Sequence, residues 1–312
     1  MPPQTIDEIR SVLVRSVEQI SSDYTKPSET ARLVRRAIGR VRWRERLLGA
    51  AAPLLSFQDT NPLLEAWKNG NLILLYHRVV DDSEVSTNPF TVPRSLFESQ
   101  VAWLSRTYTM MTASELVHRL ASSASVTGCA VITFDDGHES IFTHAWPILQ
   151  AYGIPATLFL DTGRLDVPPA LSCAQIMAMA AHGIEIGSHT ISHDDLRLLS
   201  DAALRYEIAT SREFLSGMIG QQVTGLAYPF GFYNDRVVRF VRQAGYTYAC
   251  TCLQHRTNHP GDDPYRLSRL EINLHDNEKR FQRKLNGHFA TVYAAWYRLQ
   301  AASVRGLSNE GG

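Results

Sequence analysis

Seven short apolar runs, separated by segments in which apolar residues recur every three to four positions, occupy the chain from residue 71 onward. The runs are residues 71–77, 129–134, 154–160, 184–188, 225–229, 246–251 and 269–274. Several of them are apolar throughout, which is typical of strands buried on both faces of a parallel sheet. The pattern therefore predicts seven strands.

Helical periodicity fills the intervals between these runs. The predicted helices are residues 93–106, 112–120, 141–152, 200–219 and 235–244. The second begins with the capping-box sequence Thr112-x-x-Glu115, and Gly245 closes the last. Strand and helix alternate often enough to indicate an α/β fold with a mainly parallel sheet. A barrel and an open, doubly wound sheet explain this pattern equally well.

Residues 1–66 are predicted to form a helical extension, ahead of a main domain at 67–289 and a C-terminal helix with a disordered tail at 290–312. Within the extension, residues 31–48 hold seven arginines and one acidic residue on an amphipathic helical pattern. Two interpretations of this helix are open. It either lies on an anionic membrane surface with Trp43 at the interface, or it packs on the main domain with its basic face in water.

Charge and composition narrow the class of protein. Thirty-one basic and 31 acidic residues give a formal net charge of zero, which excludes a field that would gather nucleic acid as the primary partner. The four cysteines, at positions 129, 173, 250 and 252, are irregularly spaced and predict reduced thiols. Neither a signal segment nor a membrane-spanning run is evident. We expect a cytoplasmic protein, peripheral to the inner membrane face if the basic helix binds lipid.

Two consecutive carboxylates end one of the predicted strands. In VITFDDG, residues 131–137, the apolar run stops at Asp135 and Asp136, and a glycine follows that permits a tight turn. The carboxyl ends of strands form the active face of α/β folds. Adjacent residues leaving a strand point in different directions, so one carboxylate can bind a metal while the other addresses a water. An ordinary turn in which Asp136 caps a helix explains the same residues.

A pair of histidines follows another predicted strand. In GSHTISH, residues 187–193, His189 and His193 are four positions apart and can face a single ion. Neutral imidazoles suit zinc, and an added carboxylate completes a set that leaves coordination positions open for water and substrate. The same spacing taken alone is also found in surface or core histidines that bind nothing.

Together these segments resemble the polysaccharide deacetylase family, the NodB-homology group of carbohydrate esterases. TFDDG at 133–137 and SHTISH at 188–193 are similar to its first two motifs in order, separation and strand context. Further similar segments are LLYHRV at 74–79, GIPATLFL at 153–160 and AYPFGFYN at 227–234, of which the last looks like the third motif. The resemblance covers residues 71–285 and implies a deformed (β/α) barrel of about seven parallel strands.

The resemblance also implies a metal-dependent hydrolase that removes N-acetyl groups from an N-acetylglucosamine-containing saccharide. At the matching positions, Asp136, His189 and His193 would hold a divalent metal ion, with Zn²⁺ as the first choice. Asp135 would then be the general base that takes a proton from the attacking water.

Two further elements of the site follow from the same resemblance. The turn Tyr228-Pro229-Phe230-Gly231 would contact the substrate, with the backbone N–H of Phe230 facing the oxyanion. His275, in INLHD at 272–276, resembles the family's last motif and would protonate the leaving amine. An ordinary strand with an incidental histidine is the alternative for that segment.

The chain departs from the family pattern at the residue that orients the catalytic aspartate. Many members place an arginine in the third motif, where this chain has Ala227 or an apolar neighbour. Arg266 and Arg269 are the candidates to replace it through a charge-assisted contact. The usual tryptophan-containing motif is not found, and His138 takes a place where an aromatic residue is common. His77 either approaches the mouth of the site or packs at a strand end.

The segments around the strands are closer to deacetylases of exopolysaccharide synthesis than to those that trim cell walls, so we expect a role in polysaccharide biosynthesis or modification. Two other functions stay open. One is a noncatalytic carbohydrate-binding or scaffold protein of the same fold, and the other is a hydrolase of another amide or acyl group.

Overall fold

The computed structural model describes residues 67, 69–84, 88–122, 124–252, 254 and 257–289. The predicted helical extension at 1–66, with its basic helix, and the predicted C-terminal helix and tail at 290–312 lie outside the described residues. The division into domains therefore stays a prediction.

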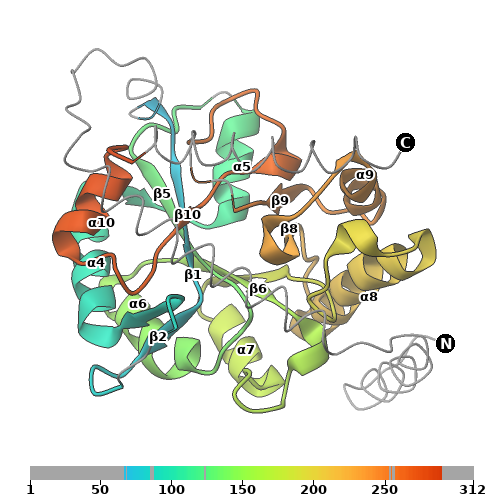
Figure 1. Cartoon of the computed structure of the whole chain (residues 1–312), viewed down its shortest axis with the longest axis horizontal. Coiled ribbons are helices and arrows are strands. Elements are labelled where there is room, and N and C mark those ends of the chain that lie inside the picture. The colour runs from blue at the N-terminus through green and yellow to red at the C-terminus, as the bar shows by residue number, and fades with distance from the viewer. Residues whose placement is uncertain are drawn as a thin grey trace, which may run out of the picture.

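A curled parallel sheet forms the centre of the domain, with helices around it (Figure 1). Its strands are β1 (Leu72–Tyr76), β5 (Cys129–Phe134), β6 (Ala156–Leu160), β7 (Ile184–Ser188), β8 (Gly225–Ala227), β9 (Tyr248–Cys250) and β10 (Leu270–Glu271). They follow the order β10-β1-β5-β6-β7-β8-β9, and all of these pairings are parallel. Leu267, just ahead of β10, forms a parallel bridge with Cys250 of β9 and so brings the two ends of the sheet together. The seven predicted strands are confirmed, and they form a deformed (β/α) barrel rather than an open sheet.

Three short strands were not predicted from the pattern. β4 (Thr109–Met110) pairs with β5, whereas β2 (Arg78–Val80) and β3 (Thr91–Pro93) form a separate two-stranded sheet. Strands of two or three residues are too short to show an alternating pattern.

Seven α-helices are described, and five of them match predicted segments. They are α4 (Arg94–Thr107), α5 (Ala113–Ala121), α6 (Trp146–Tyr152), α7 (Cys173–Ala180), α8 (Asp201–Ile219), α9 (Asp235–Gln243) and α10 (Glu278–Leu285). The predicted capping box is present, because the Thr112 side chain accepts from the Glu115 N–H and the Glu115 carboxylate accepts from the Thr112 N–H. A wider helical turn, η1 (Ile141–Ala145), precedes α6.

The two helices that were not predicted have weak sequence signals. α7 has only eight residues, and α10 presents two apolar residues, Phe281 and Leu285, among charged ones. The described residues also contain four short 3₁₀ turns: η2 (Thr162–Arg164), η3 (Leu196–Leu198), η4 (Pro229–Gly231) and η5 (Pro264–Arg266).

Alternate residues of the strands face two different apolar clusters. Leu74 of β1 and Ile132 of β5 pack outward in a cluster with the helices, whereas Ile73 and Val131 belong to a second cluster inside the barrel. The interior cluster also contains Phe159, Ala227, Tyr248 and Cys250. Because side chains of a strand alternate between its two faces, the odd-numbered positions of β1, β5 and β6 point into the barrel.

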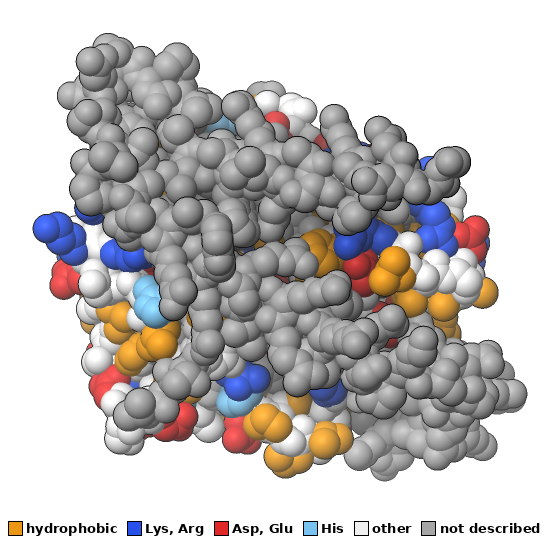
Figure 2. Space-filling model, in the orientation of Figure 1, with side chains coloured by type: hydrophobic (Ala, Val, Ile, Leu, Met, Phe, Trp, Pro, Cys, Tyr) orange, Lys and Arg blue, Asp and Glu red, His pale blue; other side chains and the backbone are white. Residues whose placement is uncertain are grey.

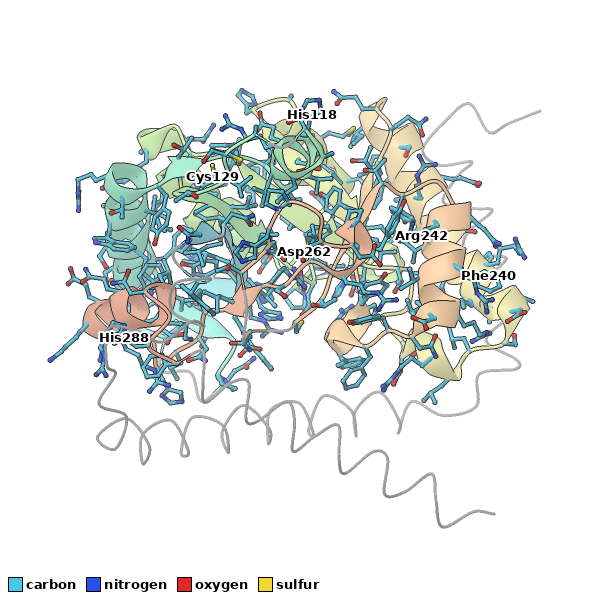
Figure 3. The ribbon with its side chains drawn as sticks, turned by 90° about the horizontal axis from the view of Figure 1, so that it is seen from above. His118, Cys129, Phe240, Arg242, Asp262 and His288 are labelled. Carbon is cyan, nitrogen blue, oxygen red and sulfur yellow. The ribbon has the colours of Figure 1, made fainter. Side chains whose placement is uncertain are left out.

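The amino end of the barrel is closed by α5. The backbone N–H of Ser114 donates to the Glu185 carboxylate at 3.1 Å, and that of Ala113 donates to the Thr157 hydroxyl at 2.9 Å. In Figure 3, His118 of α5 and Cys129 at the start of β5 lie on this side of the barrel. The carboxyl ends of the strands are therefore left for a site at the opposite end.

Other sequence expectations concern the surface and the cysteines. Where described residues reach the face shown in Figure 2, acidic and basic side chains are interspersed. The four cysteines all lie within the described residues and none forms a disulfide, as predicted. Among the described helices, none has the length and apolar character needed to cross a bilayer.

Candidate metal centre and active site

Three polar side chains of the site stand where the inward-facing positions continue past the strand ends. His77 follows β1, Asp135 follows β5 and His189 follows β7. Tyr76 pairs with Phe134 in the parallel register, so the next residues along, His77 and Asp135, emerge from neighbouring strands. Strand parity thus directs these side chains to the mouth of the barrel.

Asp136, His189 and His193 form a cluster with the geometry of a metal centre. One ligand atom from each lies within 4.8 Å of the other two. The Asp136 Oδ1 atom is 3.6 Å from His189 Nε2 and 3.5 Å from His193 Nε2. This oxygen is buried and has no hydrogen-bond partner among the described residues. Three potential ligands therefore point at one position without bonding to one another.

The two imidazoles are prepared differently for such a role. The Nδ1 atom of His189 lies 2.7 Å from the Ala227 carbonyl, which can only accept a hydrogen bond, so Nδ1 carries the proton. The Nε2 atom therefore keeps a lone pair that can bind a metal ion. Burial and the neighbouring His189 lower the pKa of His193 to about 3, against the opposing effect of Asp136. His193 is therefore neutral near pH 7, which is the form that binds metal.

Three turns of the site contain residues with left-handed backbone conformations. The φ angles are 70° at Asp136, 71° at Thr190, 58° at His193 and 58° at Phe230. Side-chain-bearing residues adopt this region at a cost that surrounding contacts must offset. Backbone strain of this kind clusters at functional sites. Here two of the left-handed residues, Asp136 and His193, are ligand candidates whose side chains face one another.

Asp135 is held by Arg269 rather than exposed to solvent. The guanidinium donates from Nη1 to Oδ1 and from Nη2 to Oδ2, both at 2.7 Å, and its Nε donates to the Thr251 carbonyl at 2.9 Å. Nη1 is also 3.3 Å from the Thr133 hydroxyl. Arg269 is thus the residue that fixes the carboxylate. Arg266, the other candidate, pairs with Asp235 and Asp263 near the surface.

Burial and charge act in opposite directions on the two aspartates. Burial alone would raise the pKa of Asp135, but Arg269, His189 and His77 together hold it below the ordinary value. The pKa of Asp136 is also lowered, because His193, His77 and His189 outweigh its burial. Both carboxylates are therefore ionised near pH 7.

The turn formed by Tyr228, Pro229, Phe230 and Gly231 lies beside the histidines. The Phe230 ring contacts the His193 ring edge-on, with centroids 4.6 Å apart. Tyr228 is buried, and its hydroxyl donates to a backbone carbonyl at 3.0 Å. A Cβ on Gly231 would lie 2.6 Å from the backbone nitrogen of Cys252, so the turn requires glycine there.

His275 and His77 differ in their position relative to the aspartates. His275 is exposed in the turn before α10, and its backbone N–H donates to the Asn273 side chain. His77 is partly buried, its ring packs on Phe90 with centroids 4.8 Å apart, and its Nδ1 has no hydrogen-bond partner among the described residues. The charge of His77 acts on both aspartates. The structure thus brings His77 to the site and leaves His275 outside the cluster.

Two features of the site were not assigned from sequence. His77 was left undecided, although counting inward positions from Ile73 leads to it. Glu207 of α8 was not considered, yet its carboxylate accepts hydrogen bonds from the loop that carries His193. His138, by contrast, bonds locally to Ser140.

Comparison with known proteins agrees with this geometry. The family model described as polysaccharide deacetylase matches residues 124–249. YxkH of Bacillus subtilis (strain 168), named as a polysaccharide deacetylase, is 33% identical over 196 residues, covering 62% of this chain and 68% of that protein. A poly-beta-1,6-N-acetyl-D-glucosamine N-deacetylase of Staphylococcus aureus is 27% identical over 242 residues, covering 69% and 82%.

The same fold is found among solved structures. The Streptococcus pyogenes deacetylase PplD, solved in complex with acetate, superposes with a TM-score of 0.62 at 24% identity, covering 69% of this chain and 98% of that one. Fold, site geometry and sequence relatives lead to the same conclusion: the chain belongs to the polysaccharide deacetylase family.

Proposed function

We propose that this protein is a metal-dependent N-deacetylase, which hydrolyses the acetamido group of an N-acetylglucosamine-containing saccharide to a free amine and acetate. The observation that carries the proposal is the convergence of Asp136, His189 and His193 beside a second carboxylate, Asp135, that is held by a buried arginine. This arrangement provides a metal site and a separate base side by side at the carboxyl end of the barrel.

The residues fit a divalent metal ion on three grounds. The Asp136 Oδ1 atom is buried without a hydrogen-bond partner among the described residues. His189 presents a free Nε2, and His193 is neutral near pH 7. Two imidazoles and one carboxylate are ligands that zinc accepts, and three protein ligands leave room for water and substrate. When bound, such an ion supplies a Lewis acid for the acetamide carbonyl and acidifies water.

Asp135 is suited to accept the proton of the attacking water. It is ionised near pH 7, and its Oδ2 is 3.9 Å from His189 Nε2, so it lies beside the ligand set without sharing the Asp136 position. The two hydrogen bonds from Arg269 fix both carboxylate oxygens and keep the base from turning toward the metal position.

His77 is suited to protonate the departing amine nitrogen. It emerges next to Asp135 from the adjacent strand and keeps an unbonded ring nitrogen, whereas His275 is exposed in a turn. The Phe90 ring packs against the His77 ring in a tilted arrangement. We therefore assign to His77 the acid role that the family resemblance gives to His275.

The left-handed turn at Phe230 contributes a donor for the developing oxyanion. Because the Phe230 ring packs against His193, the backbone of this turn stands next to the ligand set. A backbone N–H fixed in this way needs no reorganisation when negative charge develops on the carbonyl oxygen.

One of the relatives supports a proposal for the substrate class. A poly-beta-1,6-N-acetyl-D-glucosamine N-deacetylase aligns over most of its length, so we infer a polymeric N-acetylglucosamine substrate and a role in polysaccharide biosynthesis or modification.

Acetate release tests the proposal. Metal-loaded protein is incubated with β-1,6-linked N-acetylglucosamine oligomers, and Asp135→Asn serves as the matched control. We expect acetate and a free amine in equal amounts from the wild type, and almost none from Asp135→Asn. Equal rates in the two proteins would favour a noncatalytic role, and cleavage of small acetyl esters but not of oligomers would favour another acyl substrate.

A further inference from the structure

A buried carboxylate on α8 holds the loop that carries His193. Glu207 is 6% exposed. Its Oε2 atom accepts hydrogen bonds from the backbone N–H groups of Ile191 at 2.8 Å and Ser192 at 3.0 Å. Its Oε1 atom accepts one from the Ser192 hydroxyl at 2.7 Å. One side chain thus satisfies two consecutive backbone donors of the loop.

The loop needs such support because its conformation is strained. Thr190 and His193 both have left-handed φ angles, 71° and 58°, although neither is glycine. The two N–H groups bonded to Glu207 lie between these residues. Ile191 is buried, so without the carboxylate its backbone N–H would lose its acceptor away from water, and a different loop conformation would become favourable.

The two histidines of the metal centre depend on the loop to different degrees. His189 directly follows β7 and is oriented by its own ring N–H, which donates to Ala227. The His193 ring makes edge-on contacts with the His189 and Phe230 rings. Its backbone N–H donates to the Thr190 hydroxyl at 3.3 Å. The position of the His193 ring is therefore set mainly by the course of the loop backbone.

We propose that Glu207 is a positioning residue of the metal centre, which holds residues 190–193 so that His193 faces Asp136 and His189. It acts as a hydrogen-bond acceptor for two N–H groups, and its negative charge is secondary. The inference rests on the proposed function, since it assumes that this cluster binds a metal ion. Residues that support metal ligands in this way typically change metal affinity about 10- to 100-fold when they are removed.

Glu185, near the amino end of β7, provides a matched control. Its carboxylate accepts from the Thr157 hydroxyl, the Tyr248 hydroxyl and the Ser114 N–H, so it also satisfies three donors. It lies at the amino end of β7, away from the metal centre. Glu185→Ala therefore reports the cost of losing a bonded carboxylate without disturbing the histidine loop.

The test measures metal affinity on the full chain without substrate. Metal-free wild type, Glu207→Ala, Glu207→Gln and Glu185→Ala are titrated with Zn²⁺ against a chromogenic chelator, and Co²⁺ absorption reports the ligand geometry. We expect Glu207→Ala to bind metal about 10- to 100-fold more weakly with an altered Co²⁺ spectrum. Glu207→Gln, which keeps an acceptor for both N–H groups, and Glu185→Ala should stay close to wild type.

The outcomes separate this inference from the proposed function. Equal affinity in wild type and Glu207→Ala, or equal weakening in Glu207→Ala and Glu207→Gln, overturns the positioning role while the metal site stands. A wild type that binds no metal overturns the proposed function itself, and the inference with it. If Glu207→Ala does not fold, Glu207→Asp replaces it, because the shorter side chain cannot reach both N–H groups and should also weaken binding.

Discussion

Replacing Arg269 with methionine tests how the buried carboxylate of Asp135 is kept ionised. Arg269 is 1% exposed and Asp135 is 2% exposed, and two hydrogen bonds of 2.7 Å join them. Removing one partner of such a pair leaves an uncompensated charge in the interior and costs about 3–5 kcal/mol. Methionine occupies much of the same volume, so the loss reports charge and hydrogen bonding rather than a cavity.

Urea unfolding at pH 7 measures this loss, and Arg266→Met is the matched control. Arg266 lies three residues away and pairs with Asp235 and Asp263 with 41% of its side chain exposed. Exposed ion pairs of this kind contribute about 0–1 kcal/mol. We therefore expect a fall of about 3–5 kcal/mol in the free energy of unfolding for Arg269→Met and a much smaller fall for the control.

The direction in which pH changes the stability of the same variant follows from the pKa of Asp135. The pKa of Asp135 is held below its ordinary value of 3.8, so the pair stabilises the wild type fully above that value and less as pH falls through the depressed one. The stability difference between wild type and Arg269→Met should therefore narrow in acid. Loss of the guanidinium also raises the pKa of the base, so the acid limb of kcat/KM should move to higher pH.

A double variant completes the argument. Asp135→Asn in the Arg269→Met background removes the unpaired buried carboxylate and should recover part of the lost free energy of unfolding. If Arg269→Met unfolds within about 1 kcal/mol of wild type and the acid limb of its kcat/KM does not move, the pair behaves like an exposed one and does not keep Asp135 ionised.

Three further predictions concern the acid, the metal and the barrel packing. His77→Ala should lower kcat about 10²- to 10⁴-fold without loss of bound metal, whereas His275→Ala should leave kcat essentially unchanged; the reverse ranking in acetate-release assays would assign the acid to His275. Treatment with a chelator should abolish acetate release, and added Zn²⁺ should restore it; activity that survives complete metal removal would contradict the proposed chemistry. Gly225→Ala should lower the free energy of unfolding in urea by at least about 1–3 kcal/mol, because the added Cβ would lie 2.1 Å from the buried Tyr248 ring; wild-type stability would contradict the packing of β8 against β9.

The hydrophobic pattern predicted the seven main strands but not whether the sheet closes, and the closed barrel was expected only from the resemblance to the deacetylase family. Apolar runs identify strands buried on both faces, whether the sheet is open or closed. Closure involves a bridge from Cys250 of β9 to Leu267, and Leu267 lies outside the predicted strands. The helix α10 escaped prediction because its two apolar residues stand among charged ones, and its stability comes from tertiary contacts.

Some residues of the candidate site could be identified from the sequence, whereas others required the fold. Asp135, Asp136 and the two histidines were accessible from sequence because each pair lies within one short segment. The choice between Arg266 and Arg269 required the fold, since only burial shows which one enters the barrel. Glu207 and its hydrogen-bond partner Ile191 are 16 residues apart and lie on different elements. No spacing in the sequence predicts this contact.

The most direct test of the account is a metal titration of acetate release, in which metal-free protein receives Zn²⁺ stepwise and bound metal and acetate are measured together. Activity should rise in proportion to bound metal and saturate near one ion per chain, and His189→Ala should show neither. Acetate release that is independent of bound metal, or metal binding that His189→Ala leaves intact, would contradict it.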